Sequence, residues 1–515
     1  MRVEIAQLLA EAPTLEVSGP RDGEITAITY SSAEVTPGAC FVAIRGKWQD
    51  GHDYIADALE RGARLVVGMN PVERLPVAFP ADRTYVRVED SRRELGTLAT
   101  AFYGLPSDRM QVIGVTGTDG KTTTTNLIDA ILAADGKTTG LMSTVDFKIG
   151  ATRWQNDSRF TTLEAPEVQH LLRRMADACV THAIVETTSS GLALYRVWGI
   201  AYDIAVVTNI TSEHLEFHKT REAYWRAKAM LFEAVDPAHA KPALDLQPPR
   251  ACVLNADDSS FSYLRDFCAA PILTYGYQQP ADVWADQIDL GADGSRYTVH
   301  LPDGRAFAVE TPLVASYNVS NALAAIAVGY LNDMAPETMA RALATFPGVP
   351  GRMERIECGQ PFLVVVDYAH TADSLDKVLR VLRPLTQGRL IAVFGSAGDR
   401  DRVKRPEMGA VAARLADGAI ITDEDPREED AASILREIAA GAEAAGAQEG
   451  TQYRCVVGRR EGIAAAFALA QPGDTVLLAG KGHEQSIILG RAKLPWDDRQ
   501  VAREELAKLG YTATP

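Results

Sequence analysis

Short apolar runs recur along the chain, each bounded by polar or turn-forming residues. In the first hundred residues, apolar runs at 40–44 and 64–68 flank a helical stretch at 54–63, which is the pattern of a small α/β unit. A helical segment then ends at Pro106, where we place a linker.

After this linker, a strand-like run at 110–116 leads through a glycine-rich turn into a helical stretch at 121–136. Further strand-like runs follow at 182–186, 203–209 and 251–255, and an apolar-periodic helix is expected at 318–331. Strands that alternate with helices in this way predict a parallel sheet with crossover connections.

A proline- and glycine-rich segment at 346–352 precedes a third α/β block, whose apolar runs are short enough for strands buried on both faces. The sequence therefore predicts an α/β protein of three domains. They are an N-terminal domain, a central phosphate-loop domain of mainly parallel sheet and a C-terminal Rossmann-like domain, at 1–105, 106–345 and 346–515.

Length and charge agree with this picture. The chain has 515 residues, and roughly 150 residues per domain gives about three domains. Its 52 Lys and Arg against 68 Asp and Glu give a net charge of −16, which argues against binding nucleic acid or an anionic membrane surface. The six cysteines form no C-x-x-C pair, the N-terminus does not read as a signal peptide, and no stretch approaches a membrane span. We expect a cytoplasmic protein without membrane insertion. No coiled-coil arm or partner-binding tail is evident, so we also expect a monomer.

The strongest local signal is the run G-V-T-G-T-D-G-K-T-T at 114–123, between a strand and a helix. Such a turn lets backbone N–H groups surround phosphate oxygens, while Lys121 supplies positive charge and Thr122 can ligate Mg²⁺. Val115 departs from the strict P-loop spacing, and a glycine turn that merely starts a helix would show a similar pattern. We predict ATP binding by a set of loop residues: Gly117, Thr118, Asp119, Gly120, Lys121, Thr122 and Thr123.

Ionisable residues follow the next two strands. Glu186 ends one strand, and Glu213 and His214 follow the other, so these side chains are expected at the carboxyl edge of the sheet, where they could hold Mg²⁺. Taken singly, each would more often be a capping or surface residue. Lys228 lies on a largely apolar helix. It is either a surface charge or a desolvated lysine that reacts with CO₂ to form a carbamate and so becomes an anionic metal ligand.

Together these segments resemble the Mur ligases, the ATP-dependent amide-forming enzymes of peptidoglycan precursor synthesis. The resemblance includes the phosphate loop, E-x-x-S-x-G-L from Glu186, T-N-I-x-x-E-H from 208, N-V-S-N from 318, G-R-M-E from 351, D-Y-A-H from 367, G-D-R-D-x-x-K-R-P from 398 and A-G-K-G-H-E from 479. It extends in order over essentially the whole chain.

The resemblance implies a ligase that couples ATP hydrolysis to amide formation through an acyl phosphate. The C-terminal motifs favour the branch that adds a diamino acid, the third residue of the stem peptide, to UDP-N-acetylmuramoyl-L-alanyl-D-glutamate. It also implies catalytic roles for Lys121, Glu186, His214 and Lys228, and two Mg²⁺ ions held by Thr122, Glu186, His214 and carbamylated Lys228. The further nucleotide contacts it implies are Asn255, Asn318, Arg352, Asp367 and His370, the last being nearly as well explained as a hydrogen-bonded turn histidine.

For the two substrates other than ATP, the resemblance implies a UDP-sugar site on the N-terminal domain and an amino-acid site on the C-terminal domain. Ser32 would hydrogen-bond uracil or ribose, and the residues that would contact the muramoyl dipeptide are Thr161, Thr162, Thr188 and Arg196. For Arg196, a surface charge on a helix is the alternative. Those that would contact the amino acid are Arg400, Glu424, Asp425, Arg427, Gly480 and Glu484. Arg427 suits the distal carboxylate of meso-diaminopimelate, which ranks first among the candidate amino acids.

Several positions depart from the family pattern. The pocket reads E-D-P-R from 424 where D-N-P-R is usual, and the added charge of Asp425 keeps lysine and ornithine open as substrates. The uridine motif D-S-R appears as S-S-A from 31, and Ala315, Ser190 and Leu194 replace the usual residues, so an altered donor is conceivable. Three rival interpretations of the chain are a different amide ligase, such as a folylpolyglutamate synthase, a paralogue without catalysis, and a P-loop switch without ligase activity.

Overall fold

The computed structural model describes residues 1–10, 12–46, 49–158, 160–211, 215–291 and 293–512. The chain forms two compact units. The first consists of Met1–Asp289, Ser295–Thr311 and Ser316–Phe346, and the second of Leu290–Gly294, Pro312–Ala315 and Pro347–Pro515.

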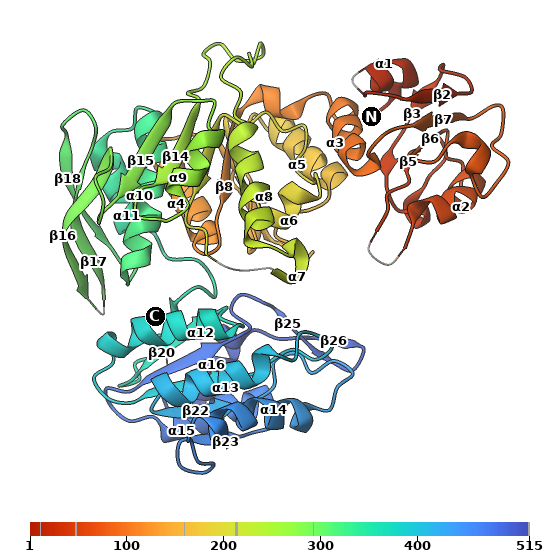
Figure 1. Cartoon of the computed structure of the whole chain (residues 1–515). Coiled ribbons are helices and arrows are strands. Elements are labelled where there is room, and N and C mark those ends of the chain that lie inside the picture. Colours follow the sequence, from red (N-terminus) through yellow and green to blue (C-terminus); the bar gives the residue numbers. More distant parts are fainter. Residues whose placement is uncertain (11, 47–48, 159, 212–214, 292, 513–515) are drawn as a thin grey trace. The chain divides into compact units, whose positions relative to one another are not determined.

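The first unit begins with a five-stranded sheet in the order β2-β7-β6-β5-β4 (Figure 1). Its strands are β2 (Glu16–Ser18), β4 (Ile28–Thr29), β5 (Cys40–Val42), β6 (Leu65–Gly68) and β7 (Thr84–Arg87), next to a short pair formed by β1 (Val3–Glu4) and β3 (Glu24–Ile25). The helices are α1 (Ile5–Ala10), α2 (Ile55–Glu60) and α3 (Ser91–Phe102), with 3₁₀ turns η1 (Ser32–Glu34), η2 (Gly51–Tyr54), η3 (Val72–Arg74) and η4 (Pro106–Arg109). Alternate residues of β5 enter different hydrophobic clusters, Cys40 and Val42 one and Phe41 the other, as expected for a strand covered on both faces.

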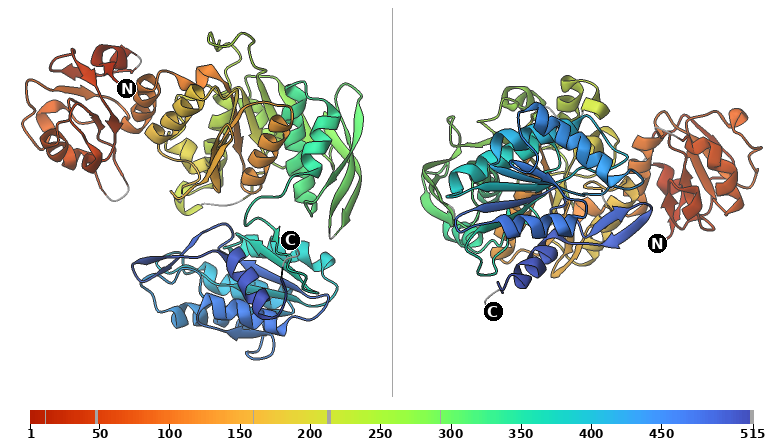
Figure 2. Two further views of the ribbon diagram at one scale, coloured as in Figure 1. Left: turned by 180° about the vertical axis from the view of Figure 1, so that it is seen from behind. Right: turned by 90° about the horizontal axis from the view of Figure 1, so that it is seen from below.

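The rest of the first unit is built on an eleven-stranded sheet in the order β11-β10-β9-β12-β8-β13-β14-β15-β16-β17-β18, parallel from β9 to β16. The strands are β8 (Gln111–Thr116), β9 (Thr139–Met142), β10 (Asp146–Ile149), β11 (Thr152–Gln155), β12 (His182–Glu186), β13 (Ile204–Val207), β14 (Ala251–Asn255), β15 (Ile272–Gly276), β16 (Val283–Gly291), β17 (Gly294–His300) and β18 (Ala306–Thr311). The helices are α4 (Lys121–Ala134), α5 (Ala165–Asp177), α6 (Ser189–Ala193), α7 (Leu215–His218), α8 (Arg221–Glu233), α9 (Phe261–Leu264), η5 (Arg265–Phe267), α10 (Ser316–Leu331) and α11 (Pro336–Ala344). Helices lie on both faces of this sheet (Figure 2).

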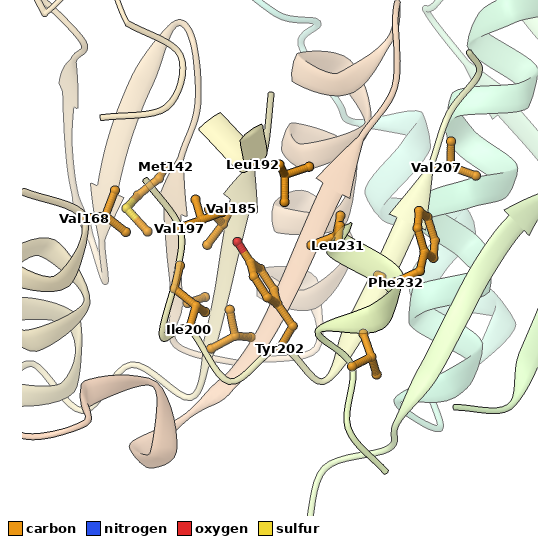
Figure 3. Packing of buried hydrophobic residues seen from close by; sticks show 14 of the residues in the cluster. Met142, Val168, Val185, Leu192, Val197, Ile200, Tyr202, Val207, Leu231 and Phe232 are labelled. Carbon is orange, nitrogen blue, oxygen red and sulfur yellow. The ribbon is translucent and has the colours of Figure 1, made fainter. Parts of the chain in front are cut away.

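Close packing places the helix α8 directly against the central strand β8. A Cβ atom on Gly114 of β8 would lie 2.7 Å from side-chain atoms of both Leu231 and Tyr202, so the strand needs glycine at this point. Figure 3 shows Leu231 and Phe232 of α8 within the hydrophobic cluster that also contains Val185 and Val207 from neighbouring strands. This packing buries one face of α8, including Lys228, at the edge of the sheet where the phosphate loop begins.

The second unit has a six-stranded sheet in the order β19-β20-β24-β21-β22-β23, in which only β19 is antiparallel to its neighbour. The strands are β19 (Glu354–Arg355), β20 (Leu363–Asp367), β21 (Leu390–Phe394), β22 (Gly418–Ile421), β23 (Tyr453–Cys455) and β24 (Thr475–Ala479), with a hairpin of β25 (Ser486–Leu489) and β26 (Ala492–Pro495). The helices are α12 (Ala372–Leu382), η6 (Arg383–Leu385), α13 (Lys404–Leu415), α14 (Ala431–Ala444), α15 (Arg459–Leu469) and α16 (Asp498–Lys508). The α/β class predicted from the sequence is confirmed.

Candidate active site

The phosphate loop, residues 117–120, joins β8 to the N-terminus of α4. Gly117 and Gly120 have φ values of +152° and +81°, and added Cβ atoms would lie 1.8 Å from Thr208 Oγ1 and 2.3 Å from Asn321 Oδ1. Only glycine fits both the conformation and the space at these positions. The neighbouring strand end holds the loop, because the amide of Thr118 donates to the carbonyl oxygen of Asn209 at 2.7 Å. Thr122 and Thr123 lie in the first turn of α4.

Two lysine side chains converge on this loop. Lys121 Nζ donates to the carbonyl oxygens of Gly117 and Thr118 at 3.1 and 2.7 Å. Lys228 Nζ reaches the same Gly117 oxygen at 2.5 Å, and its residue is 1% exposed. The interpretation of Lys228 as a surface charge is therefore wrong. Its Nζ also lies 4.6 Å from the centre of the Tyr224 ring.

Glu186 ends β12 beside the first turn of α4. Its Oε1 accepts hydrogen bonds from Thr122 Oγ1 at 3.0 Å and from Thr144 Oγ1 at 2.9 Å, and its Oε2 accepts one from the amide of Thr144 at 2.8 Å. A carboxylate and a hydroxyl beside a phosphate loop fit Mg²⁺, which prefers oxygen ligands and completes its shell with phosphate and water. Within the described residues, no three His, Cys, Asp or Glu side chains gather into a metal cage. His214 lies outside the described residues.

Hydroxyl groups continue from Glu186 towards the residues expected to bind the muramoyl dipeptide. Thr161 Oγ1 lies 2.9 Å from Thr144 Oγ1, and Thr188 Oγ1 donates to Thr162 Oγ1 at 3.0 Å. Arg196 donates through Nη1 to the carbonyl oxygen of Thr162 at 3.2 Å and is ion-paired with Glu164. Arg196 is therefore part of this cluster rather than an isolated surface charge.

The two asparagines expected near the nucleotide are hydrogen-bonded to other polar groups of the first unit. Asn255 Nδ2 donates to the carbonyl oxygen of Thr208 at 2.7 Å. Asn318 Oδ1 accepts from Asn321 Nδ2 at 3.0 Å, and Asn321 Oδ1 in turn accepts from Thr124 Oγ1 of α4 at 3.3 Å. Asn321 thus links Asn318 to the phosphate-loop helix.

The first unit contains a cavity of about 590 Å³, lined by residues of its N-terminal part together with Tyr195. It is lined by Pro13, Thr14, Leu15, Arg45, Met69, Glu89, Asp90, Ser91, Arg92, Arg93, Glu94 and Tyr195. The Ser91 Oγ and Glu94 Oε2 atoms are buried without a hydrogen-bond partner, and burial raises the pKa of the Glu94 carboxyl. Ser32 is not among the lining residues. It lies in η1, where its hydroxyl group lowers the pKa of Asp57 by hydrogen bonding.

In the second unit, the carboxyl end of β20 carries the residues expected near ribose and phosphates. Asp367 accepts the backbone amides of Met353 and Ala369 at 2.8 and 2.9 Å, and the Arg352 guanidinium lies 4.6 Å from the centre of the Tyr368 ring. His370 Nδ1 lies 2.9 Å from the carbonyl oxygen of Tyr368, and burial lowers the pKa of this histidine. The side chain of His370 thus also participates in a local turn.

The residues expected to bind the amino acid meet around a buried lysine. Lys481 is 0% exposed, and its Nζ lies 2.9 Å from Asp425 Oδ1 and 2.5 Å from Glu484 Oε2. Asp425, expected from its sequence to bring uncompensated negative charge, is therefore paired. Burial raises the pKa of Glu484, and Lys481 opposes that shift. The Glu424 Oε2 atom is buried without a hydrogen-bond partner, 3.2 Å from where a Cβ atom on Gly480 would lie.

The hydrogen bonds that hold Arg427 in place are made by its backbone and not by its side chain. Its φ is +54°, its amide donates to the carbonyl oxygen of Ile488, and its own carbonyl accepts from Gly490. The side chain is half-buried, with Nε buried and without a hydrogen-bond partner, whereas Arg400 is exposed.

The motif that begins at residue 398 contains a buried arginine whose structural role its sequence did not reveal. Arg405, 0% exposed, donates to Glu429 through both terminal nitrogens at 2.9 Å and to Glu437 at 2.8 Å. These bonds tie α13 to the segment that follows Arg427.

Sequence reasoning missed Thr144, Asn321 and Lys481. Asn321 and Lys481 lie within two of the motifs that carry the family resemblance, so their presence in these motifs could have identified them. Thr144 carries no local signal, because it follows a short strand in a segment without a motif.

The two units divide the expected site residues between them. The phosphate loop, Glu186, Lys228 and the threonines meet in the first unit. The residues that belong to the second are Arg352, Asp367, His370, Arg400, Glu424, Asp425, Arg427, Gly480 and Glu484.

In the part of the chain that the structure describes, no helix is both long and apolar enough to cross a membrane.

Comparison with known proteins identifies the family. Residues 24–103 match the Mur ligase family catalytic domain, residues 115–329 the Mur ligase middle domain, and residues 351–482 the Mur ligase glutamate ligase domain. The chain is 51% identical over 498 residues to a UDP-N-acetylmuramyl-tripeptide synthetase of Roseiflexus sp. (strain RS-1), covering 96% of each chain. It is 41% identical over 488 residues to a UDP-N-acetylmuramoyl-L-alanyl-D-glutamate--2,6-diaminopimelate ligase of Bacillus velezensis, covering 95% of each. A solved structure of such a diaminopimelate ligase superposes with a TM-score of 0.68 at 28% identity, covering 99% of this chain and 100% of that one. The matched domains and these relatives together show that the chain belongs to the Mur ligase family.

Proposed function

We propose that this enzyme is an ATP-dependent, ADP-forming ligase that adds meso-diaminopimelate to UDP-N-acetylmuramoyl-L-alanyl-D-glutamate. The observation that supports ATP-dependent phosphoryl transfer most directly is the convergence of Lys121, Lys228 and the Thr122–Glu186 pair on one phosphate loop. The names of relatives that match over nearly their whole length support the choice of substrates.

The reaction has two steps. A side-chain carboxylate oxygen of D-glutamate attacks the γ-phosphorus of ATP, and the bond from this phosphorus to the β-γ bridging oxygen breaks, giving an acyl phosphate and ADP. The amine nitrogen of the amino acid then attacks the acyl carbon, inorganic phosphate leaves, and the amine proton passes to solvent. The phosphoryl charge that develops must be neutralised by fixed groups.

The chain's own residues perform this neutralisation. Backbone amides at the start of α4 would bind phosphate oxygens, and Lys121 would leave the carbonyls of Gly117 and Thr118 to bind the outer phosphates. Thr122 and Glu186 would hold Mg²⁺, which would supply positive charge beside the transferring phosphoryl group. His214 and carbamylated Lys228 are proposed to hold a second ion.

The modification of Lys228 has an electrostatic reason. Two ammonium groups beside the Gly117 oxygen repel each other, whereas a carbamate on Lys228 faces Lys121 with opposite charge. The neutral amine adds to CO₂, forming an N–C bond and releasing one proton. Lys228 is buried beside the phosphate loop, where such a carbamate could act as a metal ligand.

For the substrates, we assign the division of labour expected from the sequence to residues 1–105, 106–345 and 346–515. The cavity of about 590 Å³, with arginines and unpartnered polar atoms on its wall, is of a size that suits a nucleotide sugar. Thr161, Thr162, Thr188 and Arg196 would hold the dipeptide. Arg427 would bind the distal carboxylate of the amino acid, and Glu424 and Glu484 would bind its ammonium groups.

An amine-screen ligation assay tests the function. The enzyme is incubated with ATP, Mg²⁺, UDP-N-acetylmuramoyl-L-alanyl-D-glutamate and, separately, meso-diaminopimelate, L-lysine or L-ornithine, and products are identified by mass. We expect a conjugate with meso-diaminopimelate. A conjugate with lysine or ornithine alone would overturn the pocket assignment, and steady ATP hydrolysis without any conjugate would favour a P-loop switch without ligase activity.

The same assay tests Arg427. Because a carboxylate would lose a charged partner inside the pocket, Arg427→Ala should raise the KM for diaminopimelate by on the order of 30-fold or more, with little change for ATP. Arg436→Ala, which removes an exposed arginine of the same unit, is the matched control. An unchanged amino-acid KM in Arg427→Ala would remove this residue from the site.

A further inference from the structure

Thr144 lies between β9 and β10 and gives Glu186 two of the three hydrogen bonds that the described residues donate to its carboxylate. Its amide and its hydroxyl donate to different carboxylate oxygens, at 2.8 and 2.9 Å. The third donor is the hydroxyl of Thr122. A metal ion bound to the Thr122 oxygen would use a lone pair of that oxygen and leave its proton to donate to Glu186, and Thr144 would supply the other two hydrogen bonds that orient the carboxylate.

The hydrogen bonds of these groups have a defined direction. An ionised carboxylate only accepts, so the hydroxyls of Thr122 and Thr144 must both donate to Glu186. Because the Thr144 hydroxyl proton is already used in this way, its oxygen can only accept from the hydroxyl of Thr161, which lies 2.9 Å away. The chain of donated hydrogen bonds therefore runs from Thr161 to Thr144 to Glu186. The oxygen of Thr161 can still accept a hydrogen bond.

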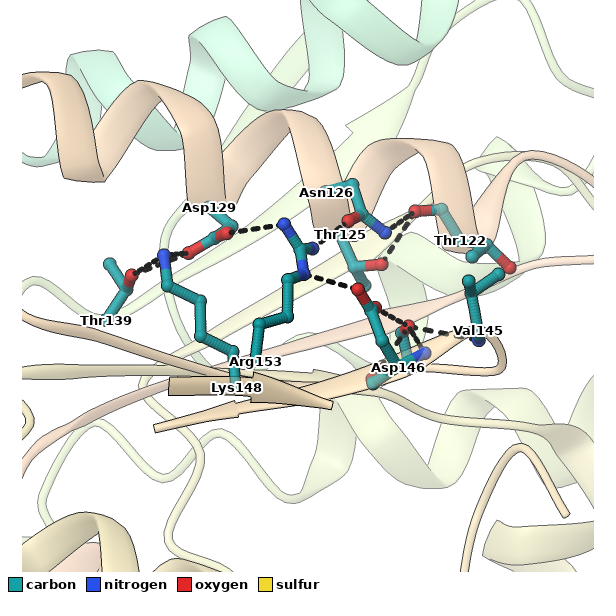
Figure 4. Close-up of polar contacts among 10 residues, drawn as sticks. Thr122, Thr125, Asn126, Asp129, Thr139, Val145, Asp146, Lys148 and Arg153 are labelled. Carbon is teal, nitrogen blue, oxygen red and sulfur yellow. Dashed lines mark hydrogen bonds and ion pairs between the residues drawn. The ribbon is translucent and has the colours of Figure 1, made fainter. Parts of the chain in front are cut away.

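A polar network joins the turn that contains Thr144 to the β10–β11 hairpin and α4, and Figure 4 shows its contacts among Asn126, Asp129, Asp146, Lys148 and Arg153. Ser143 Oγ donates to the carbonyl and carboxylate oxygens of Asp146 at 3.0 and 2.9 Å, which closes the turn that contains Thr144. Arg153 of β11 is ion-paired with Asp146 and donates to Asn126 of α4. Lys148 of β10 donates to Asp129 of α4 at 2.7 Å.

The same network reaches the phosphate-loop side of Glu186. Asn126 Nδ2 donates to the carbonyl oxygen of Thr122 at 2.8 Å. The same contacts therefore connect the β10–β11 hairpin to Thr122, which with Glu186 is proposed to hold Mg²⁺. Thr122 and Thr144 are thus held relative to each other on either side of the Glu186 carboxylate.

We propose that Thr144 is a positioning residue that fixes the Glu186 carboxylate for Mg²⁺ and links it to Thr161 of the dipeptide site. The inference rests on the proposed function, because it takes Glu186 as a magnesium ligand. Residues that orient a metal ligand typically affect metal affinity when they are lost, even though they do not touch the ion.

The test is a Mg²⁺ titration of ADP binding, measured by calorimetry without donor or amino acid. Thr144→Val keeps the side-chain shape and the backbone amide but removes the hydroxyl. It should raise the Mg²⁺ concentration for half-saturation by about 10- to 100-fold, and Thr144→Ser should restore it. Thr152→Val, on an exposed residue of the same hairpin, should leave the titration unchanged. Thr144→Ala should show the same loss as Thr144→Val and serves if the valine variant does not fold.

Two results would overturn the inference and leave the ligase function standing. One is an unchanged Mg²⁺ titration in Thr144→Val and Thr144→Ala with only the KM for the UDP-dipeptide raised, which would mean direct substrate contact. The other is an equal loss of Mg²⁺ affinity in the serine and valine variants together with lowered thermal stability, which would mean a structural role. A Glu186→Gln variant with wild-type Mg²⁺ dependence would overturn the magnesium assignment and this inference together.

Discussion

His483 shows how a single side chain links burial to pH. It is 8% exposed, its Nδ1 has no hydrogen-bond partner, and its ring lies 5.0 Å from that of Tyr368. Burial, followed by the positive charges of Arg352, Arg499 and Lys481, lowers the pKa of His483 to about 3. The native state therefore holds this imidazole neutral.

The consequence is a loss of stability in acid. The unfolded histidine has a pKa of about 6.5, so between this value and the folded value of about 3 the unfolded chain binds more protons. Stability should fall as the pH falls through this window, by at most about 1.4 kcal/mol per pH unit for this group. His483→Gln should reduce the difference between free energies of unfolding measured by urea at about pH 7.5 and about pH 5.5. Equal pH dependence in the variant and the parent would contradict this assignment.

Among the elements, the phosphate loop depends most strictly on residue type. Gly120 precedes α4 in the left-handed region, and Asn321 of α10 occupies the space that a side chain would need. Gly136, after the same helix, has a similar φ of +77° but no atom within 4 Å of an added Cβ. Comparing substitutions at these two glycines therefore distinguishes the effect of backbone strain from the effect of a steric clash.

We predict that Gly120→Ala lowers the free energy of unfolding by about 1–3 kcal/mol and weakens ADP binding, because it adds both strain and a clash with Asn321. Gly136→Ala should cost about 1–2 kcal/mol from strain alone and leave ADP binding intact. Urea unfolding and calorimetric ADP titration measure both quantities. If the two variants lost ADP affinity equally, the packing of Asn321 against the loop would not explain the glycine.

The elements that sequence reasoning identified are the buried ones. The expected strands at 182–186 and 251–255 coincide with β12 and β14, since runs of apolar residues are typical of strands covered on both faces. The hairpin β10–β11 and the strands β16–β18 were not predicted. They are partly exposed and, apart from the parallel pairing of β16 with β15, antiparallel. β10 and β11 carry Lys148 and Arg153, whose ion pairs with Asp129 form only after the hairpin meets α4.

At the scale of the whole molecule, the two compact units have hydrophobic clusters of their own. Two clusters lie wholly within the second unit, from Met353 onwards, and three others lie wholly within the first. Cores that share no residues can lose their structure independently.

We therefore predict more than one transition in urea unfolding. Of the six tryptophans, only Trp496 lies in the second unit, so tryptophan fluorescence reports mainly on the first, whereas far-ultraviolet circular dichroism reports on both. The two curves should not coincide. Added Mg²⁺ and ADP should shift the fluorescence curve to higher urea, because ligand binding stabilises the folded state by mass action. Coincident curves with a single midpoint would show one cooperative unit instead.

The sequence alone determined the α/β class, the phosphate loop and the family, because glycines with special conformations, apolar runs and ordered motifs are local features. Only the tertiary structure decided which side chains meet: Thr144 with Glu186, Lys228 with Gly117, and Lys481 with Asp425, pairs that are 42, 111 and 56 residues apart. Such contacts depend on the order of strands in a sheet and on how closely helices pack against it. Neither is encoded in the neighbouring residues, so the partner of a buried charge becomes known only once the chain has folded.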